Sequence, residues 1–274
     1  LTVFHVVPTL AAALKAVDAG VDGLVPFGTF GEGASLSLKE KIRLTEEILK
    51  VSGSAKVVPS LICNSFGEIA EYLDFANSTN IDGVMVMPPG YFRPGDDNAL
   101  TRFFEKVLGL SKKPIIAYNF PAMSLTIGPK VLSGIGVWGV KDSSGSIESA
   151  KAYLDAKIRL LIGSDVLLAK AISLGASGGI CGIANFFPKR MKLINDLAKA
   201  GKLVDAEREV APIGEFSAGI VQDGFTPGLA ISAFKSVAPK FIPTPLGDMR
   251  TPAPRIETDF SRWSRSLQYS EINN

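Results

Sequence analysis

Continuous apolar runs recur along the chain and are separated by stretches in which apolar residues return with a helical period. The apolar runs are rich in β-branched residues and do not alternate with polar positions, which is the pattern of parallel strands covered on both faces. Amphipathic stretches typical of helices lie between the runs, as at residues 37–52, 66–78 and 98–110. The predicted strands are residues 3–9, 23–28, 56–62, 83–89, 114–120, 137–143, 159–164 and 178–185.

Eight strand–helix units in a chain of 274 residues predict an α/β protein with a (β/α)8 barrel, that is, a TIM barrel, over residues 1–200. A doubly wound open sheet is the alternative. That fold would carry a glycine-rich turn after its first strand, whereas the residues PTLAAALKA that follow the first predicted strand contain no glycine. The barrel is therefore the favoured fold.

More helical patterns follow the eighth predicted strand than the closing of a barrel requires. We therefore predict a C-terminal helical extension, residues 201–274, that packs on the barrel. The patterns cover residues 186–201, 204–224 and 226–238, and a proline-rich tail covers residues 242–255.

The composition disfavours several classes of function. Lys and Arg number 29 and Asp and Glu number 27, so the formal charge of +2 gives no electrostatic basis for binding nucleic acid or a membrane surface. No apolar stretch approaches the roughly 20 residues of a membrane-spanning helix. The cysteines, Cys63 and Cys181, are expected to be buried free thiols of a reducing compartment, which indicates a cytoplasmic protein. With a single histidine, His5, we expect no metal and no other cofactor.

The active site of such a barrel lies at the C-terminal ends of its strands, so the polar residues there are the candidates. They supply one amine, two phenols and several hydroxyls, but no histidine and no pair of carboxylates. Metal-assisted hydrolysis and carboxylate-dyad chemistry are therefore disfavoured. The candidates are Thr29, Tyr91, Tyr118, Asn119, Lys141, Ser143, Ser164 and Asp165, with small residues around Ile180 and Gly182 at the eighth strand.

The stretch VWGVKDSSGS places Lys141 directly after a buried apolar run. Burial lowers the pKa of a lysine amine, because desolvation disfavours the charged form, and a neutral amine attacks carbonyls to form a Schiff base. The protonated imine withdraws electrons from a neighbouring C–C bond, and a tyrosine within reach can transfer the proton. An ion pair with Asp142 at the rim of the barrel would explain the same lysine, and position alone does not choose between the two.

Five segments together resemble the dihydrodipicolinate synthase / N-acetylneuraminate lyase family of pyruvate-dependent class I aldolases. They are GTFGEGASLSLKEK, PPGYFRP, YNFP, GVKDSSG and GSDVLLAKAISLGASGGICGIAN. They occur in the order of the family and at its approximate spacing, between about residues 20 and 250. The resemblance implies a Schiff-base mechanism that needs no cofactor.

The resemblance also implies a role for each matching residue. Lys141 would form the Schiff base, Tyr118 would act as general acid and base over the imine, and Thr29 would relay protons through Tyr118. Tyr91 would complete this relay across a subunit interface, which implies a homotetramer built from dimers. Backbone amides of the GTFGE loop would hold the carboxylate of the keto acid. The implied substrate-binding residues are Gly28, Phe30, Ser143, Gly163, Asp165 and Ile180.

Three departures from the family pattern bear on the substrate. Phe30 replaces the second threonine of the usual pair and removes one hydroxyl from the carboxylate clamp. Met123 stands where dihydrodipicolinate synthases usually carry an arginine for the carboxylate of the aldehyde, and a thioether cannot replace a bidentate guanidinium. Val166 follows Asp165 where the sialic acid lyases place an acid. The GTFGE loop is also similar to the aromatic hydratase-aldolases, whose strand-5 motif lacks the Tyr-Asn pair.

We therefore expect an aldolase or lyase that cleaves or forms a 4-hydroxy-2-oxo acid, such as a 2-keto-3-deoxy sugar acid. Its small-molecule partners would be pyruvate and an aldehyde. Condensation of pyruvate with aspartate semialdehyde, the dihydrodipicolinate synthase reaction, is the alternative within the family. A catalytically silent ligand-binding barrel is the alternative of another class, supported by Phe30 and by the short connection between the first two predicted strands.

Overall fold

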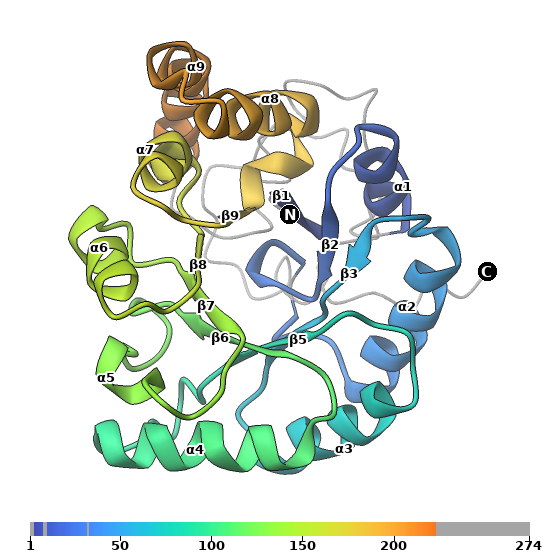
Figure 1. Cartoon of the computed structure of the whole chain (residues 1–274). Coiled ribbons are helices and arrows are strands. Elements are labelled where there is room, and N and C mark those ends of the chain that lie inside the picture. Colours follow the sequence, from blue (N-terminus) through green and yellow to red (C-terminus); the bar gives the residue numbers. More distant parts are fainter. Residues whose placement is uncertain (1–2, 8–9, 32, 223–274) are drawn as a thin grey trace.

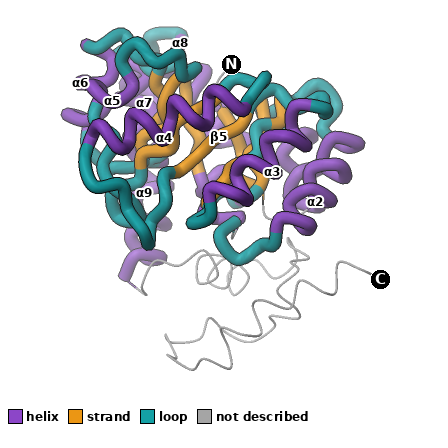
Figure 2. The backbone as a smooth tube through the Cα atoms, turned by 90° about the horizontal axis from the view of Figure 1, so that it is seen from below, coloured by secondary structure: helices purple, strands orange, loops and turns teal. Residues whose placement is uncertain are grey.

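A ring of parallel strands lies inside a layer of helices in the computed structural model, which describes residues 3–7, 10–31 and 33–222 (Figure 1). A view turned by 90° also shows the strands enclosed by helices (Figure 2). Within the described residues, the neighbouring strands pair in parallel. The strands are β1 (Val3–Val7), β2 (Gly23–Pro26), β3 (Lys56–Val57), β4 (Ser60–Ile62), β5 (Val84–Met87), β6 (Ile115–Asn119), β7 (Gly139–Asp142), β8 (Leu160–Ile162) and β9 (Gly178–Cys181).

The third predicted strand closes the ring, although a proline divides it into β3 and β4. The strand order β3-β2-β1-β9-β8-β7-β6-β5-β4 has these two pieces at its ends. Pro59 has no N–H to donate, so the regular ladder stops there. Hydrogen bonds continue on both sides, since the N–H of Val58 donates to the Leu24 carbonyl at 2.9 Å and the Met85 N–H donates to the Pro59 carbonyl at 2.8 Å. The predicted (β/α)8 barrel is therefore confirmed.

The helices begin where the sequence supplies capping residues. Ser37 and Glu40 form a reciprocal capping box, and Ser65, Asp96 and Ser146 each accept a hydrogen bond from a first-turn N–H. The helices are α1 (Leu10–Asp18), α2 (Leu38–Val51), α3 (Phe66–Asn77), α4 (Asp97–Leu110), α5 (Pro129–Leu132), α6 (Ile147–Asp155), α7 (Leu168–Ser173), α8 (Pro188–Lys199) and α9 (Leu203–Gln222). The short connection between the first two strands thus accommodates helix α1.

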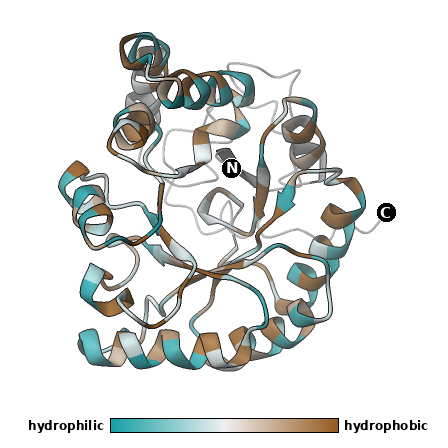
Figure 3. Cartoon of the chain, viewed as in Figure 1, coloured by the Kyte–Doolittle hydropathy of each residue, from teal (hydrophilic) through white to brown (hydrophobic). Residues whose placement is uncertain are grey.

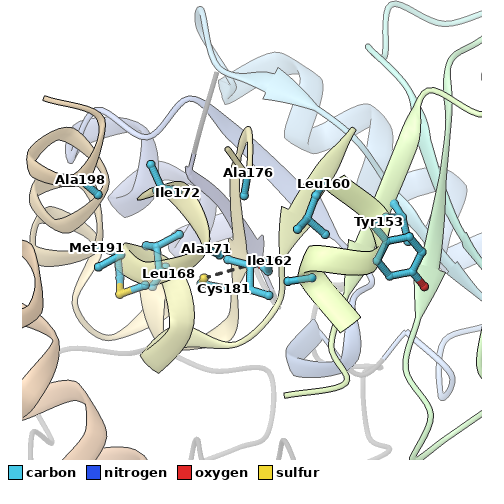
Figure 4. Packing of buried hydrophobic residues seen from close by; sticks show 14 of the residues in the cluster. Tyr153, Leu160, Ile162, Leu168, Ala171, Ile172, Ala176, Cys181, Met191 and Ala198 are labelled. Atoms are coloured by element: carbon cyan, nitrogen blue, oxygen red, sulfur yellow. Dashed lines mark hydrogen bonds between the residues drawn. The ribbon is translucent and has the colours of Figure 1, made fainter. Parts of the chain in front are cut away.

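Apolar side chains fill two regions, the interior of the barrel and the layer between strands and helices. Because side chains alternate along a strand, Ile116 and Tyr118 of β6 join the inner cluster, whereas Ala117 between them joins an outer one. Figure 3 shows hydrophobic colour on much of the strands, with hydrophilic colour at β3 and at the end of β7, and both colours along the surrounding helices. In the outer layer, Leu168 of α7 and Met191 of α8 lie near Cys181 of β9 (Figure 4).

Helix α9 continues this outer layer beyond the eighth strand–helix unit. It contacts α8, α7 and the short 3₁₀ helix Asp165–Leu167, and its Ala206 and Ile213 are buried in the same apolar cluster. The predicted boundary between a barrel at residues 1–200 and an extension at 201–274 stays a prediction. The predicted helix at 226–238 and the proline-rich tail lie outside the described residues.

Candidate active site

Tyr118 and Lys141 are brought together by the pairing of β6 with β7. The two residues are register partners, so their side chains leave neighbouring strands at the same level of the barrel interior. The Lys141 amine lies 4.0 Å from the centroid of the Tyr118 ring. Both side chains are almost fully buried, with 4% of Lys141 and 1% of Tyr118 exposed. An amine and a phenol therefore share one small space at the strand ends.

Thr29 reaches the same space from the loop that follows β2. Its Oγ1 lies 2.9 Å from the Tyr118 hydroxyl, a hydrogen bond in which either oxygen could be the donor. The loop is tightly folded, since the N–H groups of Gly31 and Gly33 donate to the carbonyl of Gly28 at 2.9 and 3.3 Å. A Cβ on Gly33 would collide with the Phe27 carbonyl, so only glycine fits there. The fold of this loop therefore directs the Thr29 hydroxyl toward the Tyr118 hydroxyl.

Asp142 does not pair with Lys141, although the two are adjacent in sequence. Its carboxylate lies on the other face of β7 and accepts hydrogen bonds from the Asn119 amide at 2.7 Å and from the Ser144 hydroxyl at 2.9 Å. Among the described residues, no ion pair within 4.0 Å involves Lys141. The rim ion pair considered from the sequence is therefore not formed.

Gly163 at the end of β8 leaves room for Lys141 and Ser143. Its N–H donates to the Asp142 carbonyl at 2.7 Å, which holds the two strand ends close together. A Cβ at this position would collide with the Ser143 hydroxyl and lie 3.0 Å from Cε of Lys141. The absence of a side chain thus allows the lysine and the serine hydroxyl to lie beside the β8 end.

Phe30 lies against the end of β9 rather than in solvent. A Cβ on Gly182 would collide with the Phe30 ring, so the ring rests directly on the glycine backbone. Phe30 is partly buried and packs on both the inner cluster, which includes Ile180, and an outer one. An aromatic ring and a glycine therefore share the space beside Thr29, at the positions where the sequence predicted substrate contacts.

Asp165 connects the loops that follow β8 and β9. Its Oδ1 accepts a hydrogen bond from the Ile183 N–H at 3.1 Å. Burial raises the pKa of Asp165 to about 6, and the positive charge of Lys141 opposes this rise. Burial, reinforced by the negative charge of Asp165, raises the pKa of the nearby Cys181 thiol. The carboxylate predicted to bind substrate thus has one oxygen engaged with the backbone.

Tyr91 is highly exposed, whereas Lys141 and Tyr118 are buried. It exposes 79% of its surface and packs edge-on against Phe92, with ring centroids 4.9 Å apart. The Asn64 side chain fixes its backbone by accepting from the Tyr91 N–H at 3.0 Å. Within the described part of the chain, no hydrogen bond joins the Tyr91 hydroxyl to Tyr118. The structure therefore brings together Lys141, Tyr118 and Thr29, but not Tyr91.

The site also involves Asn119, a sequence candidate to which no role was given, and Asp142, which was considered only as an ion-pair partner of Lys141. Asn119 follows Tyr118 by one position and Asp142 follows Lys141 by one position, so the alternation of strand side chains would have predicted their pairing on the outer face.

No three His, Cys, Asp or Glu side chains gather as a metal-ligand set within the described residues. None of the described helices is long and apolar enough to span a membrane.

Comparisons with known proteins identify a family and similar sequences. The model of the dihydrodipicolinate synthetase family matches residues 11–232. The 4-hydroxy-tetrahydrodipicolinate synthase of Chlamydia trachomatis is 30% identical over 206 residues, which cover 73% of this chain and 71% of that protein.

Solved structures support the same fold. Dihydrodipicolinate synthase from Bacteroides thetaiotaomicron matches with a TM-score of 0.80 and 21% identity, over 99% of this chain and 98% of the other. The 2-keto-3-deoxygluconate aldolase of Sulfolobus solfataricus, in complex with D-KDPG, matches with a TM-score of 0.78 and 20% identity, over 99% and 95% of the two chains. The chain therefore belongs to the dihydrodipicolinate synthetase family of pyruvate-dependent class I aldolases.

Proposed function

We propose that the protein cleaves or forms a 4-hydroxy-2-oxo acid, such as a 2-keto-3-deoxy sugar acid, through a Schiff base on Lys141. The observation that carries the proposal is the inner group of Lys141, Tyr118 and Thr29. The amine lies 4.0 Å from the Tyr118 ring centroid, and the phenol is hydrogen-bonded to Thr29 at 2.9 Å. A buried amine beside a phenol that has a proton-relay partner suits imine chemistry.

These positions support the following reaction. The amine of Lys141 attacks the C2 carbonyl, water leaves, and a protonated imine forms. Tyr118 takes the proton of the C4 hydroxyl as the C3–C4 bond breaks, and the electron pair of that bond moves to C3 to give an enamine. The aldehyde leaves, C3 is reprotonated, and hydrolysis releases pyruvate and the free amine. Thr29 orients the phenol and exchanges protons with it, so that Tyr118 can act first as base and then as acid.

The surroundings of the amine support a hydroxylated keto acid as substrate. The Ser143 hydroxyl lies beside Gly163 and Lys141, where it can bind a substrate hydroxyl. The backbone amides of the GTFGE loop would hold the carboxylate of the keto acid, as suits an anion without a buried counter-charge. Asp165 and Ile180, near the ends of β8 and β9, would complete the binding region. Met123, 48% exposed after β6, offers no charge for a second carboxylate.

Condensation of pyruvate with aspartate semialdehyde is the second candidate reaction. It is favoured by the relatives that are about 30% identical and are named 4-hydroxy-tetrahydrodipicolinate synthase. Met123 argues against it, because a thioether cannot bind the carboxylate of the aldehyde as a guanidinium does. The two reactions share the imine with pyruvate and differ in the aldehyde.

The exposed aromatic pair Tyr91 and Phe92 supports a proposed assembly into a homotetramer, built as a dimer of dimers. These rings pack on each other, yet they expose 79% and 78% of their surface in the single chain, and exposed apolar patches often mark interaction sites. In the proposed tetramer, Tyr91 reaches the site of a neighbouring subunit and extends the proton relay there.

Borohydride reduction in the presence of pyruvate tests the proposed function. We expect an irreversible adduct of one reduced pyruvate on Lys141, identified by mass spectrometry of the digested chain. A panel of glyceraldehyde, aspartate semialdehyde, N-acetylmannosamine, glyoxylate and an aromatic aldehyde, each with pyruvate, then identifies the aldehyde through the product mass. A chain that gives no adduct at Lys141 would refute the Schiff base, and a product from aspartate semialdehyde alone would favour the second candidate.

A further inference from the structure

Asn119 and Asp142 form a buried polar pair directly behind the proposed reacting groups. Asn119 follows Tyr118 on β6, and Asp142 follows Lys141 on β7. The register of the two strands pairs Tyr118 with Lys141 and, one step further, Asn119 with Asp142. Neither Asn119 nor Asp142 has any exposed surface. The polar pair and the reacting pair therefore lie on the same two strands, back to back.

The alternation of strand side chains fixes the face on which the polar pair lies. Ala117 and Val140, two positions before Asn119 and Asp142, belong to an outer apolar cluster between strands and helices. Residues two apart on a strand share a face, so Asn119 and Asp142 also point into this outer layer. They are separated from any substrate in the barrel interior by the backbone of their own strands.

Each side chain of the pair is engaged by hydrogen bonds on both of its polar ends. The Asn119 amide donates to Oδ1 of Asp142 at 2.7 Å, and its carbonyl accepts from the Ile127 N–H at 2.9 Å. The Asp142 carboxylate also accepts from the N–H and the hydroxyl of Ser144, at 3.0 and 2.9 Å. The pair thus ties β6 to β7, to the loop after β6 and to the loop after β7.

Further bonds extend this network to the next strand and to helix α6. The Ser143 N–H donates to the backbone carbonyl of Asn119 at 2.8 Å, and the Gly163 N–H donates to the backbone carbonyl of Asp142 at 2.7 Å. The Tyr153 hydroxyl of α6 donates to the Ile127 carbonyl. Burial, with the negative charge of Asp142 as a lesser cause, raises the pKa of Tyr153 above its ordinary range, which keeps this phenol a donor.

Packing alone does not explain a carboxylate in this layer. A buried charge is costly to desolvate, and apolar residues of similar volume usually pack as well or better. A directional bond supplies register instead. A shift of one residue between β6 and β7 would turn Tyr118 or Lys141 out of the barrel interior, and it would break the bond between Asn119 and Asp142.

We infer that Asn119 and Asp142 are a positioning pair, which holds Tyr118 against Lys141 by locking the register of β6 and β7 from the outer face. The inference rests on the proposed function, because it concerns the reaction of the imine at Lys141. The pair touches neither substrate nor reacting atoms. It acts through Tyr118, whose distance from the imine decides the rate of proton transfer.

Exchange of the C3 protons of pyruvate with D2O tests the inference without an identified aldehyde. The imine on Lys141 loses a C3 proton to give the enamine, and a deuteron from solvent takes its place, which NMR follows. Asn119→Leu removes the donor to Asp142. Because a misplacement of about 1 Å can cost about 100-fold in rate, we expect exchange kcat to fall about 100-fold. The KM for pyruvate and the borohydride adduct should change little, since the amine remains in place.

Two control variants separate positioning from general loss of stability. Tyr72→Phe removes the 2.6 Å hydrogen bond between Tyr72 and Thr45, which is equally buried but lies between α2 and α3. We expect it to lower the melting temperature and leave exchange unchanged. Asp142→Asn keeps an oxygen that can accept from Asn119 and Ser144, and it should retain most of the exchange rate. If Asn119→Leu exchanges the C3 protons of pyruvate as fast as Tyr72→Phe does, the inference is wrong.

Asn119→Asp provides a second test if the leucine variant does not fold. Two facing carboxylates can share one proton, so the bond between positions 119 and 142 forms only while that proton is present. We expect exchange in this variant to fall as pH rises, more steeply than in the wild type. A pH profile parallel to that of the wild type would contradict the inference. If instead the wild-type chain forms no adduct with pyruvate, it is the proposed function that fails.

Discussion

In the part of the chain that the structure describes, two groups of one lysine, one tyrosine and one threonine lie on opposite sides of the barrel wall. In each group the tyrosine hydroxyl is hydrogen-bonded to the threonine hydroxyl, at 2.9 Å in the inner group and 2.6 Å in the outer group. The inner group is Lys141, Tyr118 and Thr29, and the outer group is Lys41, Tyr72 and Thr45.

Burial does not distinguish the two lysines, because Lys141 is 4% exposed and Lys41 is 3% exposed. Their neighbours do. The Lys141 amine lies over the Tyr118 ring, whereas the Lys41 amine donates to the sulfur of Cys63 at 3.6 Å. The residue types and the burial of the lysine and the tyrosine are therefore alike in the two groups, and the placement of the amine relative to the phenol differs.

Access differs as well. The inner group lies at the C-terminal ends of strands, where the loops of a TIM barrel form its active site. The outer group lies on the inward faces of α2 and α3, packed over β2 and β4 in an apolar cluster. The outer group is therefore enclosed between helices and strands, whereas the inner group lies where the proposed substrate would bind.

Replacement of the two lysines should give the largest contrast. Lys141→Arg keeps a positive charge but cannot form an imine, so we expect turnover to fall by at least about 10³-fold, with no borohydride adduct. Lys41→Met should leave pyruvate exchange within about threefold of wild type, since its amine lies outside the barrel interior. Adduct formation at Lys41, or retained turnover in Lys141→Arg, would show that Lys141 is not the residue that forms the Schiff base.

Removal of the two tyrosine hydroxyls should give the next largest contrast. In Tyr118→Phe, we expect pyruvate exchange to slow by about 10²–10⁴-fold while the adduct on Lys141 still forms, because the phenol transfers protons and the amine does not depend on it. Tyr72→Phe should keep the exchange rate and lose about 0.5–1.5 kcal/mol of unfolding free energy in urea titrations. Equal exchange rates in the two variants would remove the proposed role of Tyr118.

Gly182→Ala tests how tightly the inner region is filled. The new methyl group would collide with the Phe30 ring, so we expect a loss of about 1–3 kcal/mol of unfolding free energy. Adding Phe30→Ala should recover part of it, because the ring would no longer oppose the methyl group. Gly109→Ala, the same change in helix α4 with open space around it, should stabilise by up to about 1 kcal/mol. The prediction fails if both glycine variants shift stability in the same direction.

The smallest expected effect concerns the charge of Asp165 beside the inner group. Its pKa is raised from 3.8 to about 6 on folding, so the folded chain binds this proton more tightly than the unfolded chain. The stability from this group is therefore greatest below the lower of these values and is lost as pH rises to the upper one. Lys141 and Cys181 are the titratable side chains that influence it. We expect Asp165→Asn to melt higher than wild type at neutral pH and no higher at pH 4, as measured by thermal unfolding.

The pattern of the sequence was sufficient for the order of elements and for the residue types of the site. Predicted helices at 37–52, 66–78 and 98–110 agree with α2, α3 and α4 to within one residue at each end. The predicted strand at 178–185 is only half strand, because Gly182–Asn185 turns into a 3₁₀ helix that packs on Phe30. Apolar character alone does not separate a buried strand from a buried turn.

The sequence by itself determined that a lysine ends one strand, that a Tyr-Asn pair ends the strand before it, and that a hydroxyl follows the second strand. These facts are local, since they depend on apolar periodicity and on residue types within a few positions. Only the tertiary structure decided that Lys141 faces Tyr118 rather than Asp142, and that Asn119 holds Asp142 on the other face. Such contacts depend on the register between strands more than 20 residues apart, and register is set by the packing of the whole barrel.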